Sequence, residues 1–314
     1  MTATPPRRSS RPHPFGRAAC AMITPFTADG ALDLDGAQRL AVHLVDAGGC
    51  DGLVLNGTTG EAPTTSDEEK TELVRAVVDA VGDRARVTTG VGSADTRHSA
   101  ALARSAGTAG AHGVLAVTPY YSRPGQEAVL QHLRAIADAT DLPVLLYDIP
   151  ARTGTPLTAE TLLRLAEHPR VQGVKDCAYD LLKSARVMAE TGLAYSSGCE
   201  ELNLPLLAIG GSGYVSTVAN VAGRQVRSVL DAHESSDPAE AAARHLALVP
   251  LIAAVMASGT PGTVTTKALL NATGLPGGPV RGPLLAAGAE LTSHLADTLR
   301  HITGQEQPAP ALAV

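Results

Sequence analysis

Lysine is rare in this 314-residue chain, in which 21 of the 25 Lys and Arg residues are arginine. The four lysines are Lys70, Lys175, Lys183 and Lys267. Since arginine supplies the ordinary surface charge, each lysine is of interest. Three of them lie in predicted helices or loops with polar neighbours. Only Lys175 follows an apolar run, Val171–Val174, and so is expected at the end of a strand. An amine removed from water has a lowered pKa and can attack a ketone to form an imine. The alternative is a surface lysine that ends a strand.

A tyrosine ends the preceding apolar run, Pro143–Tyr147. Neighbouring parallel strands lie about 4.8 Å apart, so adjacent strand ends can place the Tyr147 phenol beside the Lys175 amine. A phenol in that place can move protons during imine formation. The alternative is an aromatic side chain that merely caps a barrel.

Two further segments offer groups that bind carboxylates. Thr58 and Thr59 lie in a glycine-flanked turn, Gly57–Gly60, whose hydroxyls and backbone N–H groups can hold a small carboxylate. Arg152 follows Tyr147 by five residues and can clamp a second carboxylate. Each signal is weak alone, because Gly/Thr turns and surface arginines are common.

The elements that would position these groups alternate between strand and helix. Short apolar runs predict strands at Ala18–Ile23, Gly52–Leu55, Arg86–Gly90, Gly113–Val117, Pro143–Tyr147, Val171–Val174, Ala194–Ser197 and Gly213–Ser216. Amphipathic stretches between them predict helices. Eight such units, in roughly 250 residues, predict an α/β fold of the (β/α)₈ TIM-barrel type, whose chemistry gathers at the C-terminal ends of the strands.

The chain beyond residue 221 shows helical patterns at Arg224–His233, Ala239–Ala257 and Ala286–Ile302, and no strand signal. We therefore predict a disordered N-terminal tail over residues 1–17, a (β/α)₈ barrel over 18–233, a C-terminal helical region over 234–303 and a loose tail over 304–314. The first segment is rich in Pro, Ser and Arg, which is typical of disorder.

Composition excludes several classes of function. The net charge is −6 and no long basic run is present, which argues against nucleic-acid binding. No apolar run reaches the ~18 residues of a membrane span, and no signal peptide is recognisable. The cysteines Cys20, Cys50, Cys177 and Cys199 are scattered, so reduced thiols in a cytoplasmic protein are expected. No metal-binding motif is present.

Four motifs together resemble one family. N-G-T-T-G-E, T-P-Y-Y-S-R-P, L-P-V-L-L-Y-D-I-P-A-R-T-G and G-V-K-D, in this order and spacing, resemble the dihydrodipicolinate synthase / N-acetylneuraminate lyase family. The resemblance runs from about Ala18 to about Leu299. It implies a lyase of the class I, Schiff-base type that uses pyruvate and no cofactor. The synthase branch is the nearest, and its members condense pyruvate with L-aspartate 4-semialdehyde on the route to lysine and diaminopimelate.

The resemblance assigns catalytic roles to four residues. Lys175 matches the lysine that forms the Schiff base with pyruvate. Tyr147, Thr58 and Tyr121 match a proton relay. In the family the tyrosine that matches Tyr121 enters the active site of a neighbouring subunit, so the resemblance implies a homotetramer built as a dimer of dimers.

The resemblance also assigns four binding residues. Thr59 matches a ligand of the pyruvate carboxylate, and Arg152 matches the arginine that receives the carboxylate of the aldehyde substrate. Gly198 and Val215 match positions that line the pyruvate pocket.

Two departures from the family pattern bear on specificity. Cys199 stands where the synthases usually have an acid after Gly198, which leaves the aldehyde open. The positions that bind the inhibitor lysine in sensitive relatives correspond to Ala62, Pro63, Asp67, Lys70, Ala94, His98 and Tyr120. Only Tyr120 fits, so weak or absent inhibition by lysine is expected.

Two alternatives to the synthase remain. A sister aldolase would cleave a sialic acid or a 2-keto-3-deoxy sugar acid, although the Thr58–Thr59 pair and Arg152 argue against a sialic acid lyase. A barrel that kept the fold could instead serve as a non-catalytic binding subunit. The complete set of candidate residues argues against that reading.

Overall fold

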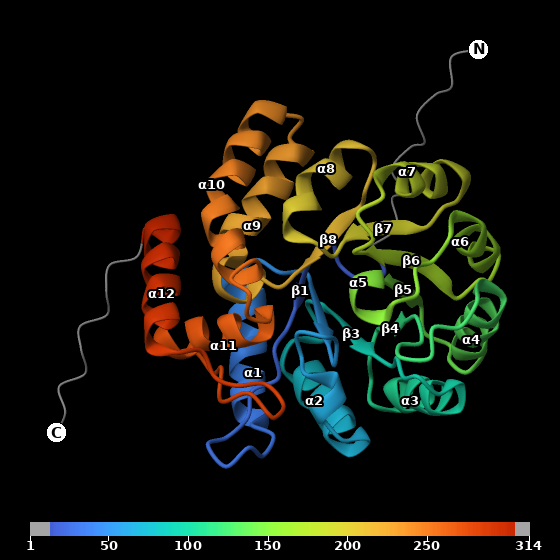
Figure 1. Ribbon diagram of the computed structural model, residues 1–314, viewed down its shortest axis with the longest axis horizontal. Coiled ribbons are helices and arrows are strands. Elements are labelled where there is room, and N and C mark those ends of the chain that lie inside the picture. Colours follow the sequence, from blue (N-terminus) through green and yellow to red (C-terminus); the bar gives the residue numbers. More distant parts are fainter. Residues whose placement is uncertain (1–12, 305–314) are drawn as a thin grey trace.

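Eight parallel strands close into a barrel in the computed structural model, which describes residues 13–304 (Figure 1). The strands pair in chain order, and β8 closes against β1. They are β1 Ala18–Ala21, β2 Gly52–Leu55, β3 Arg86–Gly90, β4 Gly113–Val117, β5 Val144–Asp148, β6 Val171–Asp176, β7 Ala194–Ser197 and β8 Gly213–Ser216. The predicted (β/α)₈ barrel is confirmed, with small shifts at the ends of β1, β5 and β6.

Helices follow the strands and form the outer layer of the barrel (Figure 1). The larger ones are α1 Leu34–Val42, α2 Asp67–Val81, α3 Thr96–Thr108, α4 Gln126–Asp138, α6 Ala159–Ala166, α7 Leu181–Glu190, α8 Asn203–Ala208 and α9 Ala219–Glu234. Shorter pieces are the π-helical η1 His43–Ala47, the 3₁₀ turns η2 Ala62–Thr64 and η3 Glu200–Leu202, and the single turn α5 Pro150–Thr153. Ser66 caps α2 through a reciprocal capping box with Glu69.

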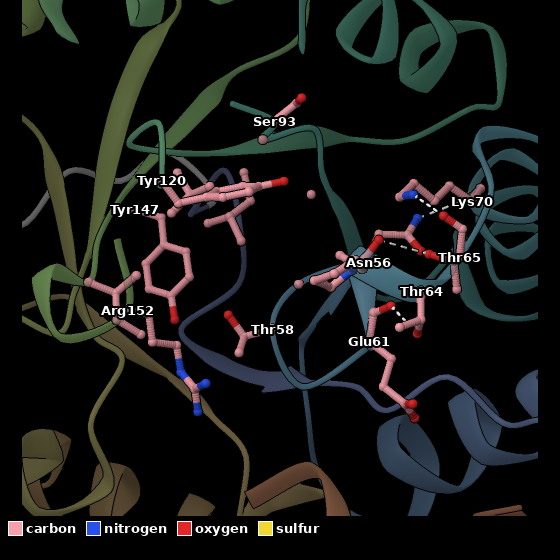
Figure 2. A pocket seen from close by; sticks show the side chains of 18 of the residues that line it. Asn56, Thr58, Glu61, Thr64, Thr65, Lys70, Ser93, Tyr120, Tyr147 and Arg152 are labelled. Carbon is pink, nitrogen blue, oxygen red and sulfur yellow. Dashed lines mark hydrogen bonds between the residues drawn. The ribbon is translucent and has the colours of Figure 1, made fainter. Parts of the chain in front are cut away.

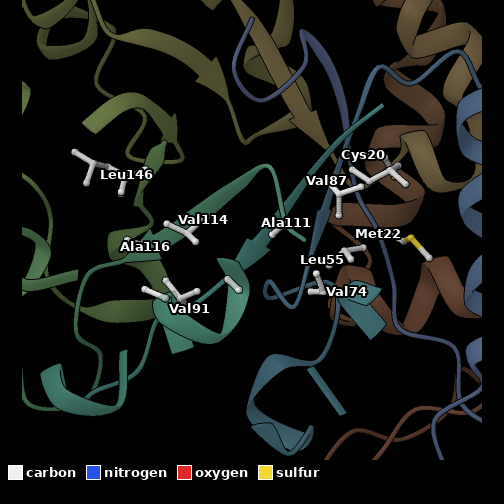
Figure 3. Packing of buried hydrophobic residues seen from close by; sticks show 14 of the residues in the cluster. Cys20, Met22, Leu55, Val74, Val87, Val91, Ala111, Val114, Ala116 and Leu146 are labelled. Carbon is white, nitrogen blue, oxygen red and sulfur yellow. The ribbon is translucent and has the colours of Figure 1, made fainter. Parts of the chain in front are cut away.

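Successive strand residues point alternately into the barrel and out toward the helices. Outward residues join the largest hydrophobic cluster, part of which Figure 3 shows between the strands and α2 and α3. The inward cluster is smaller and includes Leu145 and Tyr147 of β5 and Cys177 just after β6. The same alternation along the strand directs Gly173 and Lys175 of β6 inward as well.

Phe15 fills the bottom of the barrel. Its side chain is buried in the inward cluster, and a Cβ at Gly113 or Gly173 would lie within 3.0 Å of its ring. Only glycine leaves room for this packing. Ordered structure therefore begins before residue 18, where the sequence placed the end of the tail. Residues 1–12 and 305–314, the rest of the two predicted tails, lie outside the described residues.

Three helices follow the barrel: α10 Pro238–Met256, α11 Gly262–Ala272 and α12 Ala289–Thr303. They gather with α9 on one side of the molecule (Figure 1) and share a second hydrophobic cluster with it. By length and composition alone, α10 could cross a membrane; it packs against α9 and α12, and 33% of the stretch is buried. The sequence patterns predict α10 and α12 but give no helix signal for α11.

Candidate active site

A cavity of about 620 Å³ opens at the C-terminal ends of β2–β5 (Figure 2). Its walls come from the segment after β2, from the ends of β3, β4 and β5, and from the C-terminal extension. The polar lining includes Asn56, Thr58, Glu61, Thr64, Thr65, Asp67, Lys70, Ser93, His98, Tyr120, Tyr147, Arg152, Thr153 and Thr263. It lies where the sequence analysis expected the chemistry to gather.

Lys175 is the second-last residue of β6 and is only 6% exposed. Its Nζ lies 4.4 Å from the centre of the Tyr147 ring, and that ring lines the cavity. Burial lowers the pKa of the Lys175 amine. A larger fraction of the amine is therefore neutral at a given pH, which is the state that attacks a carbonyl carbon.

Tyr147 lies directly opposite Lys175 in the β5–β6 ladder, as the sequence predicted. Figure 2 shows the Tyr147 hydroxyl and the Thr58 side chain facing each other, with Arg152 close by. Burial raises the pKa of the Tyr147 phenol, while the bond to Thr58 and the charge of Arg152 oppose that rise. The phenol thus keeps its proton and can donate it.

The remaining binding candidates lie around these groups. A Cβ at Gly198 would come within 2.8 Å of Lys175 Cε, so glycine is needed for the lysine to fit. Val215 of β8 belongs to the inward cluster. Thr59 is buried, and its hydroxyl lies 3.0 Å from the hydroxyl of Thr217 after β8. Arg152 lines the cavity.

Tyr121 stands apart from this group. Its side chain is 95% exposed, and its backbone has a φ of +72°, which is uncommon for a residue with a side chain. Within one chain it is not among the residues that line the cavity, whereas its neighbour Tyr120 is.

The structure adds residues that the sequence analysis did not select. Cys177 interacts with the Tyr147 hydroxyl and with Lys175. It lies two residues after Lys175 on the same face of the strand, so period-two alternation could have found it. Thr263 of α11 also lines the cavity. No sequence signal pointed to it, because α11 itself was missed.

The far end of the cavity contains several of the positions that the family resemblance associates with lysine binding. His98 Nε2 lies 2.8 Å from Asp67 Oδ2, and Lys70 Nζ donates to the Thr65 carbonyl at 2.5 Å. These polar groups satisfy one another within the chain. Over residues 13–304, no group of three or more His, Cys, Asp or Glu side chains is placed to hold a metal ion.

Fold and site together define a (β/α)₈ barrel with a buried lysine equipped for imine chemistry. The family model described as the dihydrodipicolinate synthetase family matches residues 14–302. The chain therefore belongs to the dihydrodipicolinate synthetase family.

Curated relatives agree with that assignment. The chain is 61% identical over 282 residues to 4-hydroxy-tetrahydrodipicolinate synthase 1 of Streptomyces coelicolor, a match covering 90% of this chain and 92% of that protein. It is 55% identical over 291 residues to the synthase of Acidothermus cellulolyticus, covering 93% and 94% of the two chains.

Solved structures show the same fold. The dihydrodipicolinate synthase of Cyanidioschyzon merolae with lysine bound superposes with a TM-score of 0.89 at 36% identity, covering 93% of this chain and 99% of that one. A synthase from Bacillus anthracis gives 0.87 at 35% identity, with coverages of 91% and 98%.

Proposed function

We propose that this chain is a 4-hydroxy-tetrahydrodipicolinate synthase, which condenses pyruvate with L-aspartate 4-semialdehyde in lysine and diaminopimelate biosynthesis. The observation that carries the proposal is the buried amine of Lys175, which lies 4.4 Å from the centre of the Tyr147 ring, while Tyr147 lines a cavity together with Thr58 and Arg152. The names of the curated relatives support the same activity.

The geometry suggests a role for each group. The neutral amine of Lys175 attacks C2 of pyruvate, and loss of water leaves an imine. The Tyr147 phenol is placed to supply the proton that the departing hydroxide needs, and Thr58 orients that phenol. The imine then loses a proton from C3, and the resulting enamine carbon adds to the aldehyde. Arg152 lies on the same cavity and offers a bidentate partner for the carboxylate of the semialdehyde.

Pyruvate itself is proposed to lie deeper, against β6–β8. Gly198 and Val215 would bound its methyl side, and Thr59 would meet its carboxylate through the turn after β2. No cofactor is needed, because the lysine supplies the electron sink once the imine forms.

We further propose a cytoplasmic homotetramer in which Tyr121 completes the site of a neighbouring subunit. The support is the 95% exposure and the left-handed backbone of Tyr121, since both leave the phenol projecting from its own chain. Analytical ultracentrifugation tests the assembly. If Tyr121→Phe lowers turnover without changing the sedimentation coefficient, the phenol acts in chemistry. A monomeric wild type that is fully active would contradict this part of the proposal.

Borohydride trapping tests the central step. Incubation with pyruvate and borohydride should add one reduced pyruvate to the peptide that contains Lys175, and Lys175→Ala should remove that mass. Lys70→Ala is the matched control, because Lys70 is another half-buried lysine on the same cavity. If no mass appears on Lys175, both enzyme readings fail and a non-catalytic barrel remains.

The aldehyde needs its own experiment, because Cys199 replaces the usual acid near the site. Turnover with aspartate semialdehyde should exceed turnover with sugar aldehydes, and a preference for a sugar aldehyde would favour a sister aldolase. The same assay with added lysine should show weak or no inhibition, since Asp67, Lys70 and His98 already pair within the chain. Sub-millimolar inhibition would contradict that expectation.

A further inference from the structure

The four cysteines, scattered in the sequence, form two pairs in space. Cys20 of β1 interacts with Cys50, and Cys177 interacts with Cys199. All four are buried free thiols. The pairs differ in place: Cys20 and Cys50 lie in the large cluster between strands and helices, whereas Cys177 and Cys199 lie in the cluster inside the barrel.

Two adjacent strands hold the inner pair together. Asp176 and Ser197 are ladder partners at the ends of β6 and β7, and Gly198 N–H donates to the Asp176 carbonyl at 2.8 Å. Cys177 and Cys199 each follow within two residues of those partners. Continued by one residue, this register puts Cys177 opposite Gly198, so Cys199 lies one residue further along. One strand spacing and one residue rise separate the two Cα atoms by roughly 6 Å, within the range of about 4.4–6.8 Å that a disulfide spans. The two thiols already interact side chain to side chain.

The pair borders the reacting groups. A Cβ placed on Gly198 would collide with Cys177 Sγ and come within 2.8 Å of Lys175 Cε, so sulfur and lysine share one small space. Cys177 also interacts with the Tyr147 hydroxyl. Lys175, Cys177 and Cys199 are 6%, 5% and 9% exposed, so any route by which pyruvate reaches the amine would also bring a smaller hydroperoxide to these sulfurs.

Cys199 is the better nucleophile of the two. Hydrogen bonding from Cys177 lowers the pKa of Cys199, whereas the bond to Cys199 and burial raise the pKa of Cys177. Tyr179 is held in a left-handed conformation with a φ of +60°, and its hydroxyl donates to Glu201 at 2.6 Å. A thiolate attacks oxidants, so Cys199 reacts first and Cys177 resolves the product.

We propose that Cys177 and Cys199 form an oxidation site that a hydroperoxide converts reversibly to a disulfide, and that this disulfide disables the adjoining lysine. The effect on the lysine rests on the proposed function, whereas formation of the disulfide does not. The substrate of the site is a small hydroperoxide, and a dithiol restores the reduced state.

Oxidation of the two thiols by one hydroperoxide takes place in two steps. The Cys199 sulfur attacks one peroxide oxygen, the O–O bond breaks, and the departing hydroxide takes the Cys199 proton as water, leaving a sulfenic acid. The Cys177 sulfur then attacks the Cys199 sulfur, the S–O bond breaks, and a second hydroxide leaves with the Cys177 proton. Two thiols are oxidised by two electrons and one hydrogen peroxide is reduced to two waters.

Loss of activity follows from geometry. The bond draws the Cys177 sulfur toward Cys199 and away from the Tyr147 hydroxyl, and it shifts the Gly198 backbone against Lys175 Cε. A displacement of about 1 Å in reacting groups costs on the order of a hundredfold in rate. Pyruvate trapping on Lys175 should therefore fall by at least about tenfold on oxidation.

Peptide mapping after oxidation tests the proposal. The full-length protein is treated with hydrogen peroxide, catalase removes the excess, free thiols are alkylated, and the non-reduced digest is analysed by mass spectrometry. The expected result is a linked peptide pair containing Cys177 and Cys199, with Cys20 and Cys50 alkylated. The buried outer pair is thus the internal control. No linked inner pair, or equal linkage of the outer pair, would overturn the proposal.

Borohydride trapping of pyruvate, measured on the same samples, tests whether the disulfide disables Lys175. Trapping should fall after peroxide and return after dithiothreitol, while Cys199→Ser, normalised to its own untreated rate, should resist peroxide. Cys50→Ser should stay as sensitive as the wild type. If Cys199→Ser loses trapping as the wild type does, the disulfide is not the cause. If the reduced protein never traps pyruvate, the proposed function fails, and the peptide map still decides whether the disulfide forms.

Discussion

Replacing Lys267 with methionine should leave a buried carboxylate without its counter-charge. Lys267 Nζ lies 2.6 Å from Glu61 Oε1, and both side chains are 2% exposed. The same amine donates to the Pro279 carbonyl at 2.7 Å and lies 4.2 Å from the centre of the Phe26 ring. Through these contacts α11 holds the turn after β2, which carries Thr58, against the barrel.

The expected loss of stability follows from the burial of the Lys267–Glu61 pair. Removing one partner of a buried ion pair costs about 3–5 kcal/mol, because the remaining charge is unpaired and desolvated. Methionine keeps most of the volume of lysine, so little cavity cost is added. An exposed pair is the matched control: Arg244 and Glu240 lie 2.6 Å apart at 40% and 47% exposure, one turn apart on α10. Arg244→Met should change stability by less than about 0.5 kcal/mol.

Urea unfolding followed by circular dichroism, at one fixed protein concentration, measures both variants. With a slope of about 3 kcal/mol/M, Lys267→Met should lower the midpoint by about 1–1.7 M. The double variant with Glu61→Gln should recover at least about 1 kcal/mol relative to the sum of the single changes, because neither charge is then left alone. A Lys267→Met protein as stable as Arg244→Met would refute the reasoning.

Four shorter predictions concern the site and its rim. Tyr147→Phe should slow pyruvate trapping by on the order of a hundredfold with unchanged circular dichroism; an unchanged rate would remove the phenol from the mechanism. Because burial lowers the pKa of Lys175 from its ordinary 10.5, trapping at low pyruvate should rise with pH and level off below pH 10.5; an inflection at or above that value would contradict the burial argument. Arg152→Ala should raise KM for aspartate semialdehyde by about tenfold or more while trapping of pyruvate is kept, and a larger effect on pyruvate would reassign the residue. The hydrogen bond from Arg281 holds the pKa of Glu69 below its usual 4.5, so this carboxylate stabilises the fold above the unfolded pKa and loses that contribution as pH falls through the folded value. Arg281→Met should therefore flatten the fall in urea midpoint between about pH 5 and pH 3, and an unaltered acid slope would contradict the assignment.

Much of the barrel was predictable because each strand is marked by a local run of apolar residues. The run Val171–Val174 and its seven counterparts gave strands within a few residues of their observed bounds. The helix α11, Gly262–Ala272, was missed for a physical reason. Its first half is rich in Gly, Thr and Val, which have low helix propensity, and tertiary burial outweighs that preference.

The count of lysines alone predicted that each of them has a specific role. Their scarcity suggested that each has a purpose, and all four are at least half-buried in the structure: Lys175 in the site, Lys267 beside Glu61, Lys183 beside Asp148 and Lys70 on the cavity. From the sequence, three of them are expected in helices or loops among polar neighbours. The sequence alone does not show that Lys183 and Lys267 pair with buried carboxylates far away in the chain.

The sequence by itself determined that Lys175 ends a strand and faces inward next to Tyr147, because alternation along a strand and the order of strands are local properties. It also determined the family, through motifs that each lie within a few residues. Only the tertiary structure decided that Cys177 lies against Cys199, and that Lys267 reaches Glu61. Those contacts join segments 22 and 206 residues apart, and they exist because the barrel closes and its C-terminal helices fold back over the rim.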